Sequence, residues 1–151
     1  MASVNIVEFL TARLDEREAT AKATTPGPWG DHAPGSVYVE QSAVDDGHLV
    51  AEFPTCEDHE DRREADAAHI ALNDPVYVLA DLAAKRRILA LHQPGGQFSE
   101  LRDAPQYYCA TCGSGEPYEY PTGWPCETLL LLTGPFAAHP DFDPAWAVPT
   151  S

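Results

Sequence analysis

Basic residues are scarce in this sequence, which has nine Lys and Arg against 24 Asp and Glu and a formal net charge of −15. Phosphate backbones are bound by Lys and Arg, so ordinary binding of DNA or RNA is disfavoured. The deficit is uneven. Residues 31–74 carry twelve acidic side chains against Arg62 and Arg63, and residues 105–151 carry no Lys or Arg. Acidity of this kind most often contributes to solubility. The more specific interpretation is a surface that binds a basic partner protein.

Long apolar runs are also missing. No stretch approaches the roughly 20 apolar residues that span a membrane, and the first residues lack the basic cluster and apolar block of a secretory signal. We therefore expect a cytoplasmic protein, in which thiols stay reduced. The length of 151 residues and the hydrophobic content of 44% suit one globular domain, or a small domain with an appended metal module.

The common catalytic motifs are missing as well. The sequence contains no His-Glu-x-x-His, Gly-x-Ser-x-Gly, P-loop or dinucleotide fingerprint. A zinc deaminase would need His-x-Glu upstream of Pro-Cys-x-x-Cys, whereas Gln106-Tyr107-Tyr108 precedes Cys109 here. We expect a protein that is not an enzyme, with a zinc-dependent hydrolase as the less favoured alternative.

Three helices are predicted in the first 92 residues. Asn5 and Glu8 have the spacing of a capping box and begin a helix that runs to about Ala23, before the Pro- and Gly-rich segment 24–29 ends it. A second helix ends near residue 73. Asp74-Pro75 then begins a third helix that continues to about His92. The apolar stripes expected on these last two helices consist of Ala65, Ala68, His69 and Leu72, and of Val76, Leu79, Leu82, Ala83, Ile88 and Leu89.

The remaining segments predict a small sheet and a C-terminal module. Residues 37–39 and 49–53 have the composition of an antiparallel hairpin, and residues 93–106 resemble a loop. A short buried helix is expected over 127–133, followed by a proline-broken tail that Phe136, Phe142 and Trp146 hold to the body of the protein. The predicted fold class is α+β: an N-terminal helix, a small antiparallel sheet, two central helices, and a C-terminal zinc-knuckle module with a short helix. We expect two domains, an α+β core over 1–92 and a zinc-binding module with the proline-rich tail over 93–151.

Three cysteines carry the strongest chemical signal. Cys109 and Cys112 are separated by two residues and followed by Gly113, which is typical of a knuckle that directs two thiolates at one metal ion, and Cys126 follows thirteen residues later. A redox pair of this spacing usually lies between a strand and a helix in a βαβ unit, but Gly, Ser and Pro follow here. We therefore predict a structural Zn²⁺ site with three cysteines and one histidine.

These observations do not decide which residue is the fourth ligand. His92 ends the third predicted helix and is our first choice, followed by His139 beyond the short helix and then by Cys56 in the acidic segment. A zinc ion held by four side chains has no open position for water and is structural rather than catalytic.

Several segments together resemble a family of small proteins from Streptomyces-type actinobacteria and their phages, a domain of unknown function. They are Thr25-Pro26-Gly27-Pro28-Trp29, residues 65–71 with Asp74-Pro75, residues 85–89 with His92, and residues 125–129. The N-terminal half is also similar to ead-like phage accessory proteins. The resemblance implies a phage or actinobacterial setting and an accessory role, and it supports His92 as a ligand. It supplies no activity.

The leading functional hypothesis is therefore a small acidic accessory protein with a structural zinc site that acts by binding a protein partner, possible homodimers included. The alternative is an acidic nucleic-acid mimic that inhibits a basic host protein. The mimic would present the acidic segment 31–74 to its target. The candidate partner-binding residues are Asp58, Glu60 and Asp61.

Overall fold

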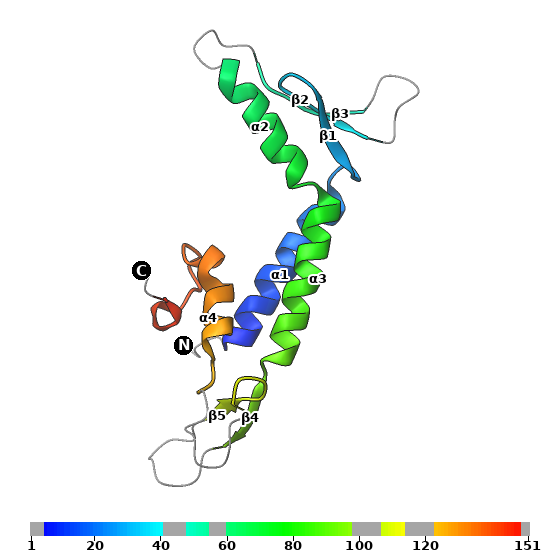
Figure 1. Ribbon diagram of the computed structural model, residues 1–151. Helices are drawn as coiled ribbons and strands as arrows, with labels where there is room; N and C mark the ends of the chain where they lie inside the picture. Colours follow the sequence, from blue (N-terminus) through cyan, green and yellow to red (C-terminus); the bar gives the residue numbers. More distant parts are fainter. Residues whose placement is uncertain (1–4, 41–47, 55–59, 98–106, 114–122, 149–151) are drawn as a thin grey trace. The chain divides into compact units, whose positions relative to one another are not determined.

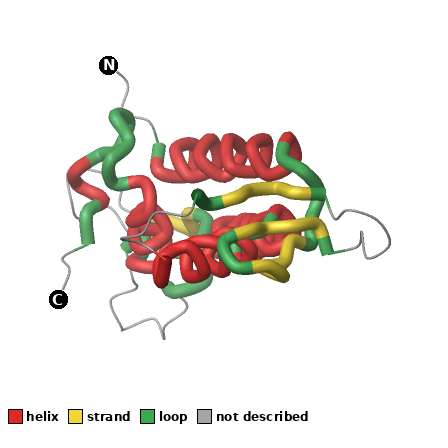
Figure 2. Tube along the Cα trace, turned by 90° about the horizontal axis from the view of Figure 1, so that it is seen from above, coloured by secondary structure: helices red, strands yellow, loops and turns green. Residues whose placement is uncertain are grey.

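Helices and small antiparallel sheets alternate along the chain, which confirms the α+β class (Figures 1 and 2). The computed structural model describes residues 5–40, 48–54, 60–97, 107–113 and 123–148. Residues 17–82 form one compact unit, and residues 1–16 with 83–151 form a second. The boundaries between these units fall inside two helices, and the predicted division into 1–92 and 93–151 stays a prediction.

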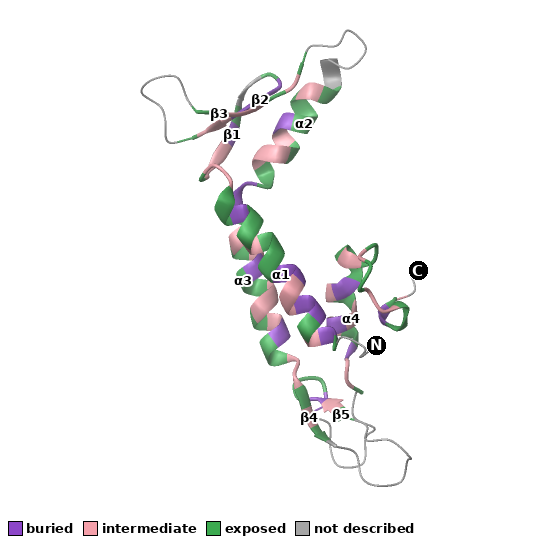
Figure 3. Cartoon of the chain, turned by 180° about the vertical axis from the view of Figure 1, so that it is seen from behind, coloured by how far each residue is buried: buried purple, intermediate pink, exposed green. Residues whose placement is uncertain are grey.

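The first helix, α1 (Ile6–Ala23), begins as the capping box predicts. The Asn5 side-chain oxygen accepts a hydrogen bond from the backbone N–H of Val7 at 3.0 Å, and the carboxylate of Glu8 accepts one from the Asn5 N–H at 3.3 Å. These bonds satisfy two of the donors that a helix start leaves without partners. The buried face of the first turns carries Ile6, Phe9, Leu10 and Leu14 (Figure 3).

Within the unit of residues 17–82, three strands form an antiparallel sheet in the order β1 (Trp29–Ala33), β2 (Ser36–Val39), β3 (Leu49–Glu52). The predicted hairpin is β2 with β3, in which Val37 lies opposite Ala51. Strand β1 was not predicted, because its sequence Trp-Gly-Asp-His-Ala has little strand propensity. It forms as the outer partner of β2, with Trp29 opposite Val39.

The helix α2 (Glu60–Leu72) is attached to this sheet through Arg63. Its guanidinium donates to the carbonyl of Phe53 at the end of β3 and to the carbonyl of Pro34 in the turn between β1 and β2, at 3.0 and 3.1 Å. Gly35 in that turn has φ +74°, and a Cβ there would lie 2.7 Å from the guanidinium. Glycine is therefore required both by the backbone conformation and by the close approach of Arg63.

The apolar stripe predicted for α2 is wrong. His69 is exposed, and Leu72 is 73% exposed, whereas the buried position of the helix is Ala67. Because most of the apolar residues of α2 are alanines, its periodicity did not distinguish the face that packs on the sheet from the face in solvent. Of the predicted partner-binding residues, Asp58 lies outside the described residues, and Glu60 and Asp61 are described only as the backbone start of α2.

The start of α3 (Pro75–Leu91) confirms the signal of Asp74-Pro75. Asp74 is buried, and its carboxylate accepts from the backbone N–H of Tyr77 at 2.7 Å and from that of Trp29 at 3.1 Å. One side chain thereby caps α3 and fixes the first residue of β1. The loop passes so close that a Cβ at Gly27 would lie 2.7 Å from the Asp74 carboxylate.

Replacing Asp74 with alanine is expected to destabilise the protein by about 2–3 kcal/mol, because a lost N-cap costs about 0.5–2 kcal/mol and an unpaired buried N–H about 1–3 kcal/mol. Urea unfolding followed by far-UV circular dichroism measures this loss. Asp66→Ala on the exposed side of α2 is the matched control and should change stability by less than about 0.5 kcal/mol. Equal losses in the two variants would contradict the double role of Asp74.

The second unit contains the first turns of α1, the end of α3 and everything that follows. Strands β4 (Pro94–Gln97) and β5 (Tyr107–Cys109) pair antiparallel, with Pro94 opposite Cys109. Residues 94–97 were predicted as loop, and two glycines with a proline explain why no strand was expected there. Arg86 of α3 pairs with Asp15 of α1 at 2.6 Å.

The C-terminal part confirms the predicted short helix and the attached tail. The helix α4 (Glu127–Thr133) is followed by two 3-10 turns, Gly134–Phe136 and Pro144–Trp146. Phe9 of α1 contacts the aromatic rings of this tail, with centroid distances between 5.1 and 6.3 Å to Phe136, His139, Phe142 and Trp146. None of the described helices is both long and apolar enough to cross a bilayer.

Candidate metal centre

His92 stands immediately after α3, where the helix ends. Its backbone N–H still donates to the carbonyl of Ile88 at 3.1 Å, so the residue continues the last helical turn and its ring position is set by the helix. The next residue, Gln93, leaves the helix and its side chain bonds back to the carbonyl of Leu89 at 2.6 Å. The end of α3 thus presents one imidazole at a fixed position.

The knuckle is a tight turn docked onto that helix end. The Gly113 N–H donates to the carbonyl of Cys109 at 2.7 Å, which closes the turn, and the Ala110 N–H donates to the carbonyl of Gln93 at 2.9 Å. The hydroxyl of Thr111 donates to the carbonyl of Leu91. These contacts join residues about twenty positions apart and bring Cys109 and Cys112 next to His92.

Cys126 approaches from the other side, as the N-cap residue of α4. Its carbonyl accepts from the N–H groups of Leu129 and Leu130 at 3.0 and 3.1 Å, so the first turn of this short helix fixes the position of Cys126. Trp124, two residues earlier, connects Cys126 to the same region. Its indole N–H donates to the carbonyl of His92 at 3.1 Å, and its backbone N–H donates to the carbonyl of Tyr107 at 2.9 Å.

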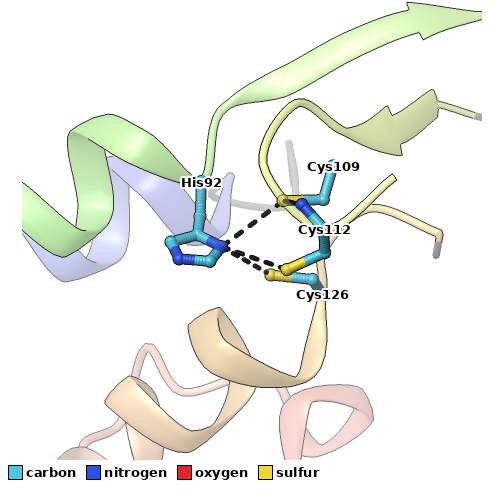
Figure 4. Close-up of side chains that lie close together, drawn as sticks. All are labelled: His92, Cys109, Cys112 and Cys126. Carbon is cyan, nitrogen blue, oxygen red and sulfur yellow. Dashed lines mark hydrogen bonds between the residues drawn. The ribbon is translucent and has the colours of Figure 1, made fainter. Parts of the chain in front are cut away.

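The four side chains converge on one point (Figure 4). The Nδ1 atom of His92 lies 3.4 Å from each of the sulfurs of Cys109, Cys112 and Cys126, and the four ligand atoms are all within 4.8 Å of one another. Cys109 and Cys126 are buried, His92 is half-buried, and Cys112 is exposed. The three sulfurs and the nitrogen therefore surround a common centre that is covered on most sides.

Hydrogen bonding alone does not account for this arrangement. A ring nitrogen of histidine carries at most one proton and can donate it to one acceptor, yet Nδ1 is equally distant from three sulfurs. A tetrahedral ion with Zn–S of about 2.3 Å and Zn–N of about 2.0–2.1 Å would place its nitrogen about 3.5 Å from each sulfur. The observed distance of 3.4 Å agrees with that geometry, so the donor set fits a tetrahedral metal ion.

The acidities of the thiols show what a cation would contribute. Burial acts to raise the pKa of Cys109, but the backbone N–H groups of Cys112 and Thr111 favour its thiolate and bring the pKa down to about 7. Desolvation and the neighbouring sulfurs of Cys109 and Cys126 raise the pKa of Cys112 to about 11. Clustered thiols therefore do not all ionise on their own at neutral pH, and a divalent cation would stabilise the thiolates.

Metal affinity is expected to fall as the pH falls. At pH 8 and below, Cys112 must lose a whole proton to bind, and below pH 7 Cys109 must lose one as well. Each released proton weakens binding about tenfold per pH unit, so the affinity for Zn²⁺ should drop by more than about a hundredfold between pH 8 and pH 6. Competition with a chromophoric chelator at several pH values measures this. An affinity that does not change with pH would exclude thiolate ligands.

Of the other two candidates for the fourth ligand, His139 does not join the cluster. His139 contacts Arg13 instead, whose Nη1 lies 2.8 Å from the ring Nδ1, and its ring packs against Phe9. Cys56 lies outside the described residues. The preferred choice, His92, is the one that the structure brings to the three cysteines.

Sequence reasoning missed the residues that support the knuckle. The ring of Tyr108 lies against three glycines, and a Cβ at Gly95, Gly96 or Gly113 would come within 2.5–3.0 Å of it. At Gly113 a Cβ would also lie 2.7 Å from the Cys109 carbonyl. The glycines were visible in the sequence, but nothing local indicated that a distant tyrosine requires them.

The fold and the Cys₃His cluster together define a small α+β protein with a candidate metal centre. The chain belongs to a family described as a family of unknown function (DUF6221), whose model matches residues 3–148. This confirms the expected membership in a family without an assigned activity. The actinobacterial or phage setting and the similarity to ead-like proteins stay predictions. No curated protein and no solved structure matches the chain.

Proposed function

We propose that His92, Cys109, Cys112 and Cys126 bind one Zn²⁺ ion and that this ion is structural. The observation that carries the proposal is the equal distance of 3.4 Å from the His92 nitrogen to each sulfur. A donor set of three thiolates and one imidazole in tetrahedral geometry is typical of zinc. In this protein the ion would join the end of α3, the knuckle and the start of α4.

The same coordination argues against catalysis. A catalytic zinc ion keeps a position for water or substrate, usually beside three protein ligands. Four side chains would fill a tetrahedron here, and two of the sulfurs come from buried residues. We therefore propose that the protein is not a zinc-dependent hydrolase and that the ion contributes shape rather than chemistry.

The function that remains is the binding of another protein. Support comes from the apolar side chains that stay in solvent, with Leu72, Val76 and Tyr77 each more than half exposed, because exposed apolar groups that cluster mark interaction sites. The accessory role suggested by the family resemblance agrees with such a function. The acidic character, with a net charge of −15, favours a basic partner and keeps the nucleic-acid mimic as the second candidate.

Two measurements on one preparation test the proposal. Elemental analysis of reduced, purified protein should find one zinc ion per chain, and its Co²⁺-substituted form should show the visible absorption of four-coordinate cobalt with thiolate ligands. A five- or six-coordinate cobalt spectrum would indicate an open coordination position and would favour the hypothesis of a zinc-dependent hydrolase. Absence of stoichiometric metal would remove the structural proposal.

Affinity capture on the same preparation tests partner binding. The mimic hypothesis predicts that a captured nucleic-acid-binding protein is released by a few hundred millimolar salt and by added DNA, since electrostatic contacts are screened. An accessory protein with an apolar contact surface would retain its partner under both treatments. Capture of no partner at native concentrations would contradict both.

A further inference from the structure

A pocket of about 350 Å³ lies within the unit of residues 17–82. It is formed where the end of α1, the loop into β1 and the first turn of α3 meet, and its walls include Ala21, Thr24, Trp29, Pro75 and Val78. Known ligand pockets begin at about 300 Å³, and an apolar cavity of about 150 Å³ already accommodates benzene. The pocket is therefore large enough for a bicyclic aromatic group.

The polar groups of the walls are already engaged within the chain. The Trp29 indole N–H donates to the carbonyl of Thr25 at 3.0 Å, and the hydroxyl of Thr24 donates to that of Ala21 at 2.9 Å. The Asn73 amide donates to the carbonyl of His69 at 2.8 Å, and Arg17 also has an interaction within the chain. The walls therefore combine the polar side chains of Arg17, Thr20 and Asn73 with apolar surface from Ala21, Trp29, Pro75 and Val78. The apolar part favours an apolar group.

Apolar side chains that neighbour the wall residues Asn73, Pro75 and Val78 in the sequence are exposed. Val76 is 54% exposed although the sequence placed it on the buried stripe of α3, Tyr77 is 59% exposed, and Leu72 is 73% exposed. A Cβ at Gly27 would lie 3.1 Å from a methyl of Val76, so this side chain borders the loop that supplies Thr24 and Trp29 to the pocket. We call Leu72, Val76 and Tyr77 the corner patch, since they lie at the corner between α2 and α3.

The pocket and the corner patch together indicate a macromolecular occupant. A small molecule enclosed in the pocket would leave the corner patch in water, whereas a protein segment that inserts one side chain would cover both. The charge of this unit determines the character of that segment, since residues 17–82 contain fourteen Asp and Glu against four Lys and Arg. Basic residues that flank the inserted side chain would be attracted to such a surface.

We infer that this pocket is the docking site for the protein partner, and that it binds an aromatic side chain, with tryptophan favoured, carried by a basic segment. This inference rests on the proposed partner-binding function and specifies its site and its chemistry. The aromatic ring packs against Trp29, Pro75 and Val78, the residues beside it cover the corner patch, and the flanking Lys and Arg contribute long-range attraction. The aromatic ring determines which partner binds, and the charge of the flanking Lys and Arg raises the rate of association.

Synthetic peptides test the inference on the full-length, zinc-loaded protein. The probes are acetyl-Lys-Lys-Trp-Lys-Lys-amide, the same peptide with a central alanine, an acidic version with four glutamates, and N-acetyltryptophanamide. Backbone amide resonances of Thr24, Trp29 and Val78 should shift with the first peptide. The alanine peptide should bind at least about tenfold more weakly, as expected for loss of an interface anchor, and the acidic peptide should not bind.

Three results would overturn the inference. Equal binding of the tryptophan and alanine peptides would mean that charge alone acts, and shifts confined to residues outside the pocket would place the site elsewhere. N-acetyltryptophanamide binding as tightly as the basic peptide would identify a small-molecule pocket instead of a docking site.

Variants separate the pocket from general surface effects. Ala21→Phe fills the pocket and should abolish the shifts, and Val76→Ser alters only the corner patch and should weaken binding at least about fivefold. The matched control is Leu131→Ser, an equally exposed leucine (57%) on α4 in the other unit, which should leave binding unchanged. If Val76→Ser and Leu131→Ser behaved alike, the corner patch would have no role.

The failure of this inference can be distinguished from failure of the proposed function. A partner that wild-type protein captures from a lysate, and that Ala21→Phe and Val76→Ser capture equally well, would place the docking site elsewhere while partner binding stands. Circular dichroism and zinc content of each variant establish that it is folded, and Val76→Ser supplies the test if Ala21→Phe is not.

Discussion

Replacing Cys109 with serine should abolish stoichiometric zinc binding and produce the largest loss of stability of any single substitution in this protein. The sulfur of Cys109 is completely buried, lies 3.4 Å from the His92 nitrogen and accepts the backbone N–H of Cys112 at 3.5 Å. A serine hydroxyl stays protonated and is a poor zinc ligand, so the variant leaves three donors where a structural site needs four.

The size of the effect follows from the coupling of metal binding and folding. Structural zinc sites in small domains have apparent binding free energies of about 10–16 kcal/mol at neutral pH. Here the Arg86–Asp15 salt bridge between α3 and α1 and the aromatic contacts of Phe9 with the tail also stabilise this unit, so only a part of that free energy maintains the fold. Even a contribution of about 4 kcal/mol would lower the thermal midpoint by about 8–16 °C for a chain of this length. Calorimetry of both proteins, with zinc content measured on the same samples, gives the comparison.

Cys56→Ser is the matched control, since Cys56 is the remaining cysteine of the sequence and was a candidate ligand. It should retain one zinc ion and the midpoint of the wild type. A chelator added to wild-type protein should reproduce the Cys109→Ser result. The ligand assignment would be wrong if Cys109→Ser kept a full equivalent of zinc, or if Cys56→Ser lost it.

The helix boundaries were the part of the fold that local sequence determines. The side chains of Asn5 and Asp74 bond to backbone N–H groups within three residues, so their effect is visible in any short window of sequence. The helix α4 was also predicted from a local signal, the run of four leucines after Cys126.

The site was predictable to three ligands out of four. The spacing of Cys109 and Cys112 is local and has a known geometric meaning, but the fourth ligand depends on which distant helix end docks on the knuckle. That docking uses the Ala110 N–H and the Thr111 hydroxyl. Such groups are so common along a sequence that they do not indicate which distant segment they contact. His139 was a reasonable candidate until the structure showed its ring beside Arg13.

Strands and buried faces were the least predictable features, because tertiary contacts decide them. Strand β1 exists through its pairing with β2 and the bond from Trp29 to Asp74, and β4 exists through its pairing with β5 and the stacking of Tyr108 on Gly95. Val76 was assigned to the apolar face of α3 by its spacing, yet it is more than half exposed.

Phe9→Ala carries the second large expected effect. The ring is 2% exposed and lies at the centre of an aromatic cluster, 5.1 Å from Trp146 and about 6 Å from Phe136 and Phe142 between centroids, with the Arg13 guanidinium 5.5 Å away. Truncation of a buried phenylalanine costs about 3–5 kcal/mol. Because the tail 134–148 has little regular structure of its own, this cluster is what attaches it to α1.

The expected result is therefore specific to the tail. Urea unfolding should show the loss of about 3–5 kcal/mol, and the near-UV circular dichroism of Trp146 should diminish. The zinc content should stay at one ion per chain, because α3, the knuckle and α4 hold the ligands. Leu131→Ala, on the exposed side of α4 at 57% exposure, is the control and should change stability by less than about 0.5 kcal/mol. A variant that lost zinc along with the tail signal would show instead that the aromatic cluster and the metal centre form one cooperative core.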